Sequence, residues 1–390
     1  MKNINYIIGT SEICRTPLPP YSETACEFAA ELSAALMKNP DARLYPDIMS
    51  FAFWCRKSNI YALKEQFPSK QRRLGRGLVF HVAPSNVPLN FAFTYMFALL
   101  AGNSSIVRIP SKPFPQIEIV CKVLKQILEH YPEIEKRTAI IQYPPDLSIT
   151  QQLCLIADAR VIWGGDQTVS DIRSCPAKPR CLDLTFADRY SFCVINGDAV
   201  LKADERELGK LAENFYNDTY LMDQNACSSP QLICWKNGSG SARQCFWEAV
   251  FNYTKKRYRL QDASTVDKYT QMCLDAVNYD FVTCVRHQEN LIYRIELTSL
   301  PDDLTALRGN SGYFYEYELG NLEDLNGNIT EKFQTLTYYG VSSEELREYV
   351  LSSHARGIDR IVPVGKALDI GIIWDGYDIV GTLSRIVDVI

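Results

Sequence analysis

Short apolar runs alternate with longer stretches of mixed polarity from residue 77 onward. Each of these runs has five to seven residues and few polar interruptions. Such runs, separated by helical patterns, indicate βαβ units that build a parallel sheet covered on both faces. The predicted strands are 77–83, 104–109, 138–143 and 160–164, and the predicted helices are 87–101, 116–131, 148–157 and one that begins near residue 166.

The pattern changes after a further strand at 191–195. A long charged helix at 199–216, a strand at 231–235 and a helix at 242–258 follow, while a helix at 22–37, with Ser22 as its N-cap, precedes the first sheet. We therefore expect an α/β protein of two domains. Their predicted bounds are 1–197, of which 1–70 form an N-terminal helical part, and 198–356, with 357–390 packing back on the core.

Composition narrows the class of protein. A chain of 390 residues exceeds what one hydrophobic core usually supports, and 46% hydrophobic with 22% charged residues is ordinary for a globular protein. Lys and Arg number 41 against 46 Asp and Glu, so no basic excess favours a nucleic acid or an anionic membrane. The most apolar stretch, 87–101, is shorter than the ~20 residues that span a bilayer.

Cysteine is the unusual component. Thirteen cysteines in a chain whose first residues show no secretory signal do not suggest a disulfide framework. We expect reduced thiols and a cytoplasmic protein. One of them, Cys227, lies between a helix and a strand among small residues, which suits a thiolate nucleophile. The alternative is a buried structural cysteine.

Other candidate residues directly follow the predicted strands of the first domain. Ligands of parallel sheets bind at these carboxyl ends of the strands. Asn86 follows the first strand, and its amide could hold a developing oxyanion, although Ser85 or Asn86 could instead cap the next helix. Gly164 and Gly165 open a turn that could approach a phosphate or be a turn only. Arg108 offers a cation near the same edge, or is a solvated surface arginine.

Several other kinds of site are not expected. The four histidines are scattered, no C-x-x-C pair has zinc spacing, and neither a G-x-S-x-G elbow nor a P-loop occurs. His81 lies inside an apolar strand, so we expect a core histidine rather than a base.

The order of the motifs carries more information than any one of them. GLVFHVAPSNVPLNFAF, LLAGNSSIVRIPSK, VIWGGDQ, DRYSFCVI and DQNACSSPQ, closed by RIVPVGKALD, WDGYD and LSRIV, resemble the acyl-CoA reductase family of bioluminescence (LuxC-like). That family belongs to the aldehyde dehydrogenase superfamily. The resemblance extends from about residue 77 to the C-terminus and implies a Rossmann-like NADP-binding domain followed by a catalytic domain.

The resemblance also implies roles for particular residues. Cys227 matches the nucleophile that the thioester substrate acylates, with a depressed pKa expected, and Asn86 matches the oxyanion donor. Arg108 and Ser111 stand where the superfamily contacts the adenosine ribose, and a guanidinium there favours NADPH over NADH. The remaining implied cofactor contacts are Pro84, Ser85, Gly164, Gly165 and Asp166.

Two departures from the superfamily pattern bear on the reaction. The second glycine of G-S-x-x-x-G is missing near Ser170, and the E-L-G-G-K motif is replaced by the sequence at 182–188. Without that Glu, activation of water is disfavoured, whereas coenzyme A needs no such base. The sequence thus favours NADPH-dependent reduction of an acyl-CoA, or another acyl thioester, to an aldehyde.

Three alternatives stay open: a non-acylating aldehyde dehydrogenase, a cysteine acyltransferase subunit without redox activity, and a catalytically idle subunit. By analogy with the family, the expected partners are an acyl-activating synthetase and further copies of this chain.

Overall fold

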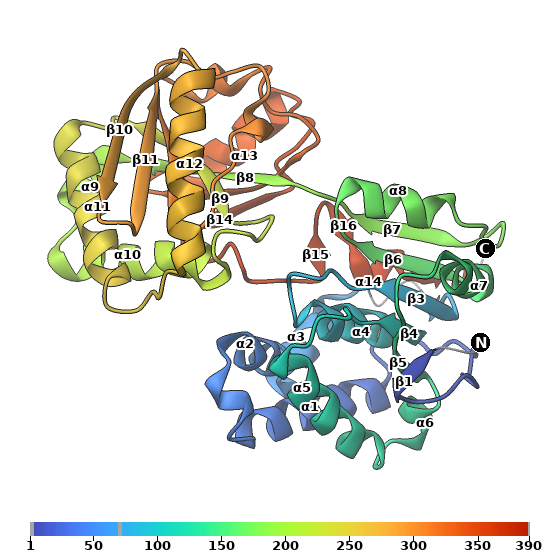
Figure 1. Cartoon of the computed structure of the whole chain (residues 1–390). Coiled ribbons are helices and arrows are strands. Elements are labelled where there is room, and N and C mark those ends of the chain that lie inside the picture. Colours follow the sequence, from blue (N-terminus) through green and yellow to red (C-terminus); the bar gives the residue numbers. More distant parts are fainter. Residues whose placement is uncertain (1–3, 69–71, 389–390) are drawn as a thin grey trace. The chain divides into compact units, whose positions relative to one another are not determined.

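The chain folds into two compact units, each with its own sheet. A computed structural model describes residues 4–68 and 72–388 (Figure 1). The first unit combines Met1–Ala187 with Tyr377–Ile390, and the second is Asp188–Gly376. The first transition comes before the expected boundary at 197/198 because β8 (Tyr190–Asn196) pairs with strands of the second sheet.

The first unit is built on a six-stranded sheet in the order β1-β5-β4-β3-β6-β7, in which only β1 is antiparallel. β3 lies at the centre, and the strand order reverses there, because β4 and β5 extend to one side while β6 and β7 extend to the other. The strands are β1 (Asn5–Ile8), β3 (Leu78–Val82), β4 (Ser104–Arg108), β5 (Thr138–Gln142), β6 (Ala159–Trp163) and β7 (Leu182–Phe186).

The helices of this unit confirm the predicted alternation. α7 and α8 pack their apolar residues on one face of the sheet, and the central helix α4 is buried along almost its whole length. The helices are α1 (Glu23–Lys38), α2 (Pro46–Trp54), α3 (Lys57–Gln66), α4 (Asn90–Leu100), α5 (Pro115–Leu128), α6 (Pro132–Glu135), α7 (Leu147–Ile156) and α8 (Asp166–Ser174), with the short η1 (Ala42–Leu44).

The C-terminal segment divides between the units. β14 (Arg360–Pro363) stays in the second sheet, next to β13 (Phe333–Tyr339). The last residues return to the first unit, where β17 (Ser384–Ile386) pairs with β2 (Arg73–Gly75). The expectation that the whole of 357–390 forms one segment therefore needs correction, because its first part is a strand of the second sheet.

The second unit is built on a seven-stranded sheet in the order β10-β11-β12-β9-β8-β13-β14. All neighbouring strands are parallel except β10 and β11. The amino ends of β8, β9, β13 and β14 consequently lie along one edge. The further strands are β9 (Pro230–Lys236), β10 (Val282–Gln288), β11 (Ile292–Leu297) and β12 (Tyr313–Leu319). The short β15 (Ile373–Trp374) lies at the end of this unit, and β16 (Tyr377–Asp378) belongs to the first unit.

Helices cover both faces of this sheet. α9, α10 and α11 pack over one core, and α12 and α13 contribute to the core on the opposite face (Figure 1). The predicted helix at 199–216 is two helices, since Asp204 forms a capping box that starts α10. The helices are α9 (Gly197–Lys202), α10 (Glu205–Thr219), α11 (Gly240–Thr254), α12 (Asp262–Asn278), α13 (Ser343–Ser352) and α14 (Ile379–Thr382), the last in the first unit, with η2 (Tyr220–Met222), η3 (Leu304–Ala306) and η4 (Leu322–Leu325).

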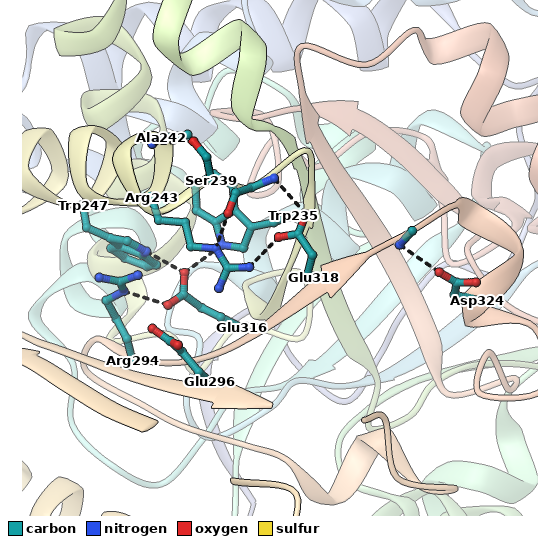
Figure 2. A network of polar contacts seen from close by, with 12 residues as sticks. Trp235, Ser239, Ala242, Arg243, Trp247, Arg294, Glu296, Glu316, Glu318 and Asp324 are labelled. Carbon is teal, nitrogen blue, oxygen red and sulfur yellow. Dashed lines mark hydrogen bonds and ion pairs between the residues drawn. The ribbon is translucent and has the colours of Figure 1, made fainter. Parts of the chain in front are cut away.

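A buried carboxylate fastens α11 to the sheet (Figure 2). Glu316 on β12 has no solvent exposure and accepts hydrogen bonds from the indole N–H groups of Trp235 and Trp247, at 2.7 and 2.8 Å. The guanidinium of Arg294 on β11 donates to its other oxygen at 2.7 Å. The charge of Glu316 is therefore fully partnered, as a buried ion must be.

Among the described residues, none of the helices has both the length and the apolar composition required to cross a bilayer.

Candidate active site

Cys227 lies on a tight turn between η2 and β9. The two residues that begin this turn, Asp223 and Gln224, have left-handed backbone angles, with φ of 49° and 61°. Such angles cost energy for residues other than glycine and persist only where the surroundings hold them. The turn is therefore held in place by contacts outside itself.

Gln224 supplies those contacts. Its buried amide donates to the carbonyl oxygens of Pro230 and Tyr313 at 3.1 and 2.9 Å. Its side-chain oxygen accepts from the backbone N–H groups of Gly312 and Tyr313, both at 3.1 Å. The side chain of Gln224 thus ties the Cys227 turn to the start of β9 through Pro230 and to the start of β12 through Gly312 and Tyr313.

Cys227 sits at the amino-end edge of the second sheet, beside the central strands. The Oγ of Ser191, on β8, donates to the carbonyl oxygen of Cys227 at 2.7 Å and accepts from the backbone N–H of Thr335 at 3.1 Å. This bridge joins the Cys227 turn to β8 and β13. Cys227 precedes β9, as the sequence predicts, and therefore lies at the amino end of that strand.

Polar groups from neighbouring elements surround the thiol. The side chain of Gln334, at the start of β13, hydrogen-bonds to Cys227 and donates through Nε2 to Asp375 at 2.6 Å. Arg189 lies 3.3 Å from Asp375 and also pairs with Asp359. The Cys227 backbone N–H faces its own sulfur, where an oxyanion donor is required.

The expectation of a depressed pKa for Cys227 is wrong. Burial of the thiol, followed by the negative charge of Asp375, raises its pKa to about 11, against the opposing effects of Gln334 and Arg189. The pKa of Asp375 is itself raised, mainly by burial. The thiol is therefore neutral at pH 7, first because burial penalises the thiolate and second because the charge of Asp375 opposes it.

The first unit presents a second polar edge at the carboxyl ends of its strands. β3 and β6 are neighbours at the point where the strand order reverses, and such switch points are where open α/β sheets bind ligands. Pro84, Ser85 and Asn86 follow β3, with the last two exposed. α4 begins only at Asn90 and has no side-chain cap, so the alternative in which Ser85 or Asn86 caps it is wrong.

The glycine turn follows β6 at the same edge. Gly165 is the N-cap of α8, and Asp166 is the first residue of that helix. A Cβ added at Gly165 would meet no atom within 4 Å, so the turn offers open space beside a helix N-terminus, where anions bind favourably. A shallow hollow of about 500 Å³ continues along the helix, lined by Asp166, Val169, Ser170, Arg173 and Ala187.

Arg108 ends β4, the other neighbour of β3. Its guanidinium lies over the ring of Tyr143, 4.5 Å from the centroid, in a cation–π contact that orients the charge. Ser111 is exposed in the loop that follows, and the Gln142 side chain fixes this loop by donating to the carbonyl of Pro110 at 2.8 Å. Arg108 is thus a positioned cation rather than a freely solvated one.

His81 is a core residue, as predicted. Its two ring nitrogens contact the hydroxyl oxygens of Thr94 and Ser105, at 2.8 and 3.3 Å, and its side chain is fully buried. Among residues 4–68 and 72–388, no group of His, Cys, Asp and Glu side chains could hold a metal ion. All thirteen cysteines are free.

The structure thus gathers the predicted residues at two places. Asn86, Arg108 and the glycine turn share one edge of the first sheet, and Cys227 lies in the second unit. Sequence analysis missed the residues around Cys227, although Arg189 and Asp375 lie within the motifs DRYSFCVI and WDGYD. Gln224, Ser191 and Gln334 had no assigned role either.

The fold defines the class of protein. 1-Pyrroline-5-carboxylate dehydrogenase from Thermus, in a structure with bound NAD, is similar with a TM-score of 0.60 at 12% identity, over 93% of this chain and 79% of that one. The fold is therefore that of the aldehyde dehydrogenases. The family model for acyl-CoA reductase (LuxC) matches residues 56–286, more than half of the chain, and the protein belongs to this family.

Curated relatives carry one description. The "long-chain acyl-protein thioester reductase" of Vibrio harveyi is 24% identical over 302 residues, 75% of this chain and 60% of that protein. The protein of the same description from Photorhabdus luminescens is 26% identical over 165 residues, 42% of this chain and 32% of that one. The matched regions thus span less than two thirds of these relatives' lengths.

Proposed function

We propose that this protein reduces an acyl thioester, such as an acyl-CoA, to the aldehyde with NADPH, through a covalent acyl-cysteine at Cys227. The observation that carries the proposal is the Cys227 turn, which is strained, held by Gln224 and Ser191, and surrounded by polar groups. Membership of the acyl-CoA reductase family and the activity that the curated relatives are named for support the same chemistry.

The acylation step needs no separate base, because the proton lost by Cys227 is taken up by the departing CoA sulfur. The Cys227 sulfur attacks the thioester carbonyl, and the bond from the carbonyl carbon to the CoA sulfur breaks. The proton of the Cys227 thiol ends on the sulfur of CoA, and the acyl group stays on Cys227. The Cys227 backbone N–H would stabilise the negative oxygen as it forms, and the role of second donor is the one that the family resemblance gives to the Asn86 side-chain amide.

The residues at the edge of the first sheet fit a nicotinamide dinucleotide. When bound, this cofactor supplies the hydride that converts the acyl-cysteine to aldehyde and releases the Cys227 thiolate. The glycine turn at Gly164 and Gly165 would hold the pyrophosphate at the start of α8. Arg108 would hold a 2′-phosphate, with no carboxylate at Ser111 to repel it, which favours NADPH over NADH.

Release of a free acid by water is disfavoured by the segment that replaces E-L-G-G-K. That segment is β7, and its Asp183 is bound in a two-pronged ion pair with Arg160, both contacts at 2.6 Å. Each oxygen of this carboxylate is held by a charge-assisted hydrogen bond from Arg160, so the side chain is committed to the ion pair and is not placed to activate a water molecule. An acyltransferase or non-acylating dehydrogenase is less well supported, and a synthetase partner, self-association and a cytoplasmic location stay predictions.

The test is covalent labelling. Incubation with a panel of acyl-CoAs without cofactor, followed by intact-mass and peptide mass spectrometry, should show one acyl group on Cys227. Cys227→Ala should abolish both the label and acyl-CoA-dependent NADPH oxidation, while Cys273→Ala, which removes an exposed thiol, should retain both. Turnover by the Cys227→Ala variant would remove Cys227 from the mechanism.

A further inference from the structure

The polar groups around Cys227 form an ordered network that the proposed reaction leaves unused. Gln334 contacts both the thiol and Asp375, so it connects the two groups. Asp375 is only 7% exposed and has a left-handed backbone, with φ of 52°. A carboxylate buried on strained backbone beside a nucleophile requires contacts that hold it there.

Arg189 provides those contacts. Its guanidinium donates to the carbonyl oxygens of Phe333 and Lys332, at 2.6 and 3.2 Å, which fixes it to the start of β13. From there it pairs with both Asp359 and Asp375. Its positive charge is therefore shared between two carboxylates, which leaves the negative charge of Asp375 only partly compensated.

We propose that Gln334 and Asp375 are positioning residues that govern the ionisation of Cys227, with Asp375 opposing and Gln334 favouring the thiolate. This inference rests on the proposed role of Cys227 as nucleophile. Asp375 adds to the effect of burial in keeping the free thiol protonated, which protects it from alkylation and oxidation. Gln334 holds the sulfur in place and donates to it once the proton leaves.

Other charges face the thiol from the packed elements. Arg360, on β14, interacts with Cys227 electrostatically, and its guanidinium lies 4.4 Å from the centroid of the Trp374 ring. It donates to the carbonyl oxygens of Lys366, Ala367 and Asp369, which neutralise no charge. Asp359 faces Arg189, as described above. Two carboxylates and two guanidiniums thus set the field, and Asp375 is the carboxylate that acts on the sulfur itself.

Alkylation of Cys227 measures this control directly. Rates of reaction with iodoacetamide from pH 7 to 11, followed by peptide mass spectrometry on the full chain, report the thiolate fraction. Asp375→Asn should raise the rate at pH 8 about tenfold, which corresponds to a pKa lowered by about one unit. Gln334→Leu should lower the rate, because a donor to the thiolate is lost. The two variants thus change the rate in opposite directions.

Controls separate this effect from unfolding. The exposed Cys273 in the same digest should react equally in all variants. Glu345→Gln removes a carboxylate that pairs with Lys236 at the opposite edge of the sheet, and it should leave the Cys227 profile unchanged. A Cys227 profile that is the same in Asp375→Asn and in the unaltered protein, with equal Cys273 rates, would overturn the proposal, as would faster alkylation in Gln334→Leu.

The experiment needs neither acyl-CoA nor cofactor. A shifted alkylation profile in a protein that takes up no acyl group would therefore support the network and contradict the proposed function. Acylation of Cys227 in a protein whose alkylation profile is not shifted by the substitutions would support the proposed function and contradict the role of the network.

Discussion

Arg108 is the side chain that we propose distinguishes NADPH from NADH. It is held over Tyr143 at the end of β4, where its charge is partly buried and oriented. A charge-assisted hydrogen bond to a 2′-phosphate is worth about 1.5–3 kcal/mol, or roughly 10- to 100-fold in binding. NADH lacks this phosphate and gains nothing from the guanidinium at that point.

Arg108→Glu should therefore raise KM for NADPH at least about tenfold while changing KM for NADH far less. Initial rates with each cofactor at saturating acyl-CoA measure the two constants. Lys125→Glu reverses a charge at an exposed position of α5 in the same unit and should change neither. An equal rise for both cofactors in Arg108→Glu would show that the arginine does not recognise the 2′-phosphate.

Cys227 and Asn86 could be chosen from the sequence because they lie in contiguous motifs whose order is specific. The ionisation of Cys227 could not, because Asp375 reaches it from a segment almost 150 residues further along the chain. Nothing local to Asn225–Ser229 carries a charge, so the sequence offered no basis for the sign of the shift. That information comes from the fold, which brings Asp375, just after β15, within hydrogen-bond distance of Gln334 on β13.

At the scale of elements, apolar runs predicted β3, β4, β5 and β6 of the first sheet to within one residue or so, since near-continuous burial leaves a clear pattern. β1 was missed because only one of its four residues is buried. β7 was missed because its alternate residues are only partly buried. The break between α9 and α10 was missed because a capping box needs only Asp204 and Glu207 and leaves the helical pattern around it intact.

The Glu316 network is the clearest contact between elements, joining α11 to β9, β11 and β12 (Figure 2). Glu316→Gln leaves the Arg294 guanidinium, which is only 9% exposed, without its partner charge. Removal of one member of a buried pair costs about 3–5 kcal/mol. We expect a loss of about 3 kcal/mol in the free energy of unfolding, measured by urea denaturation of the full chain.

Glu318→Gln is the matched control, because that carboxylate lies two residues along the same strand, is half exposed and pairs with Arg243. A surface pair of this kind contributes at most about 1 kcal/mol. Equal effects of the two substitutions would show that the buried pair has no special weight.

At the scale of the whole molecule, the chain passes between the two units at 187/188 and again at 376/377. Arg189 and Asp375, which stand beside these two passages, form an ion pair within the second unit. The two residues of this ion pair, both of which influence the Cys227 thiol, thus lie next to the two points where the chain passes between the units.

Buried titratable groups should give the two units opposite responses to pH. Burial lowers the pKa of His81, in the first unit, to about 3, below the ordinary value of 6.5. The unfolded chain then binds more protons, so this contribution to stability rises as pH rises from 3 to 6.5. Burial raises the pKa of Asp218, in the second unit, to about 7 from 3.8. Its contribution is complete below pH 3.8 and is lost as pH rises towards 7.

Each group alone changes stability by on the order of 4 kcal/mol across its window. Asp47 in the first unit and Asp375 in the second also have raised pKa values, so substitutions are needed to isolate the two groups. Hydrogen exchange of the intact chain between pH 4 and 7, corrected for intrinsic exchange rates, resolves β3 and α4 from α10 and β14. His81→Asn should remove the rise in protection with pH in β3 and α4 only. Asp218→Asn should remove the fall in protection with pH in α10 and β14 only. If either substitution changed the pH dependence in the elements of both units, the units would not respond separately.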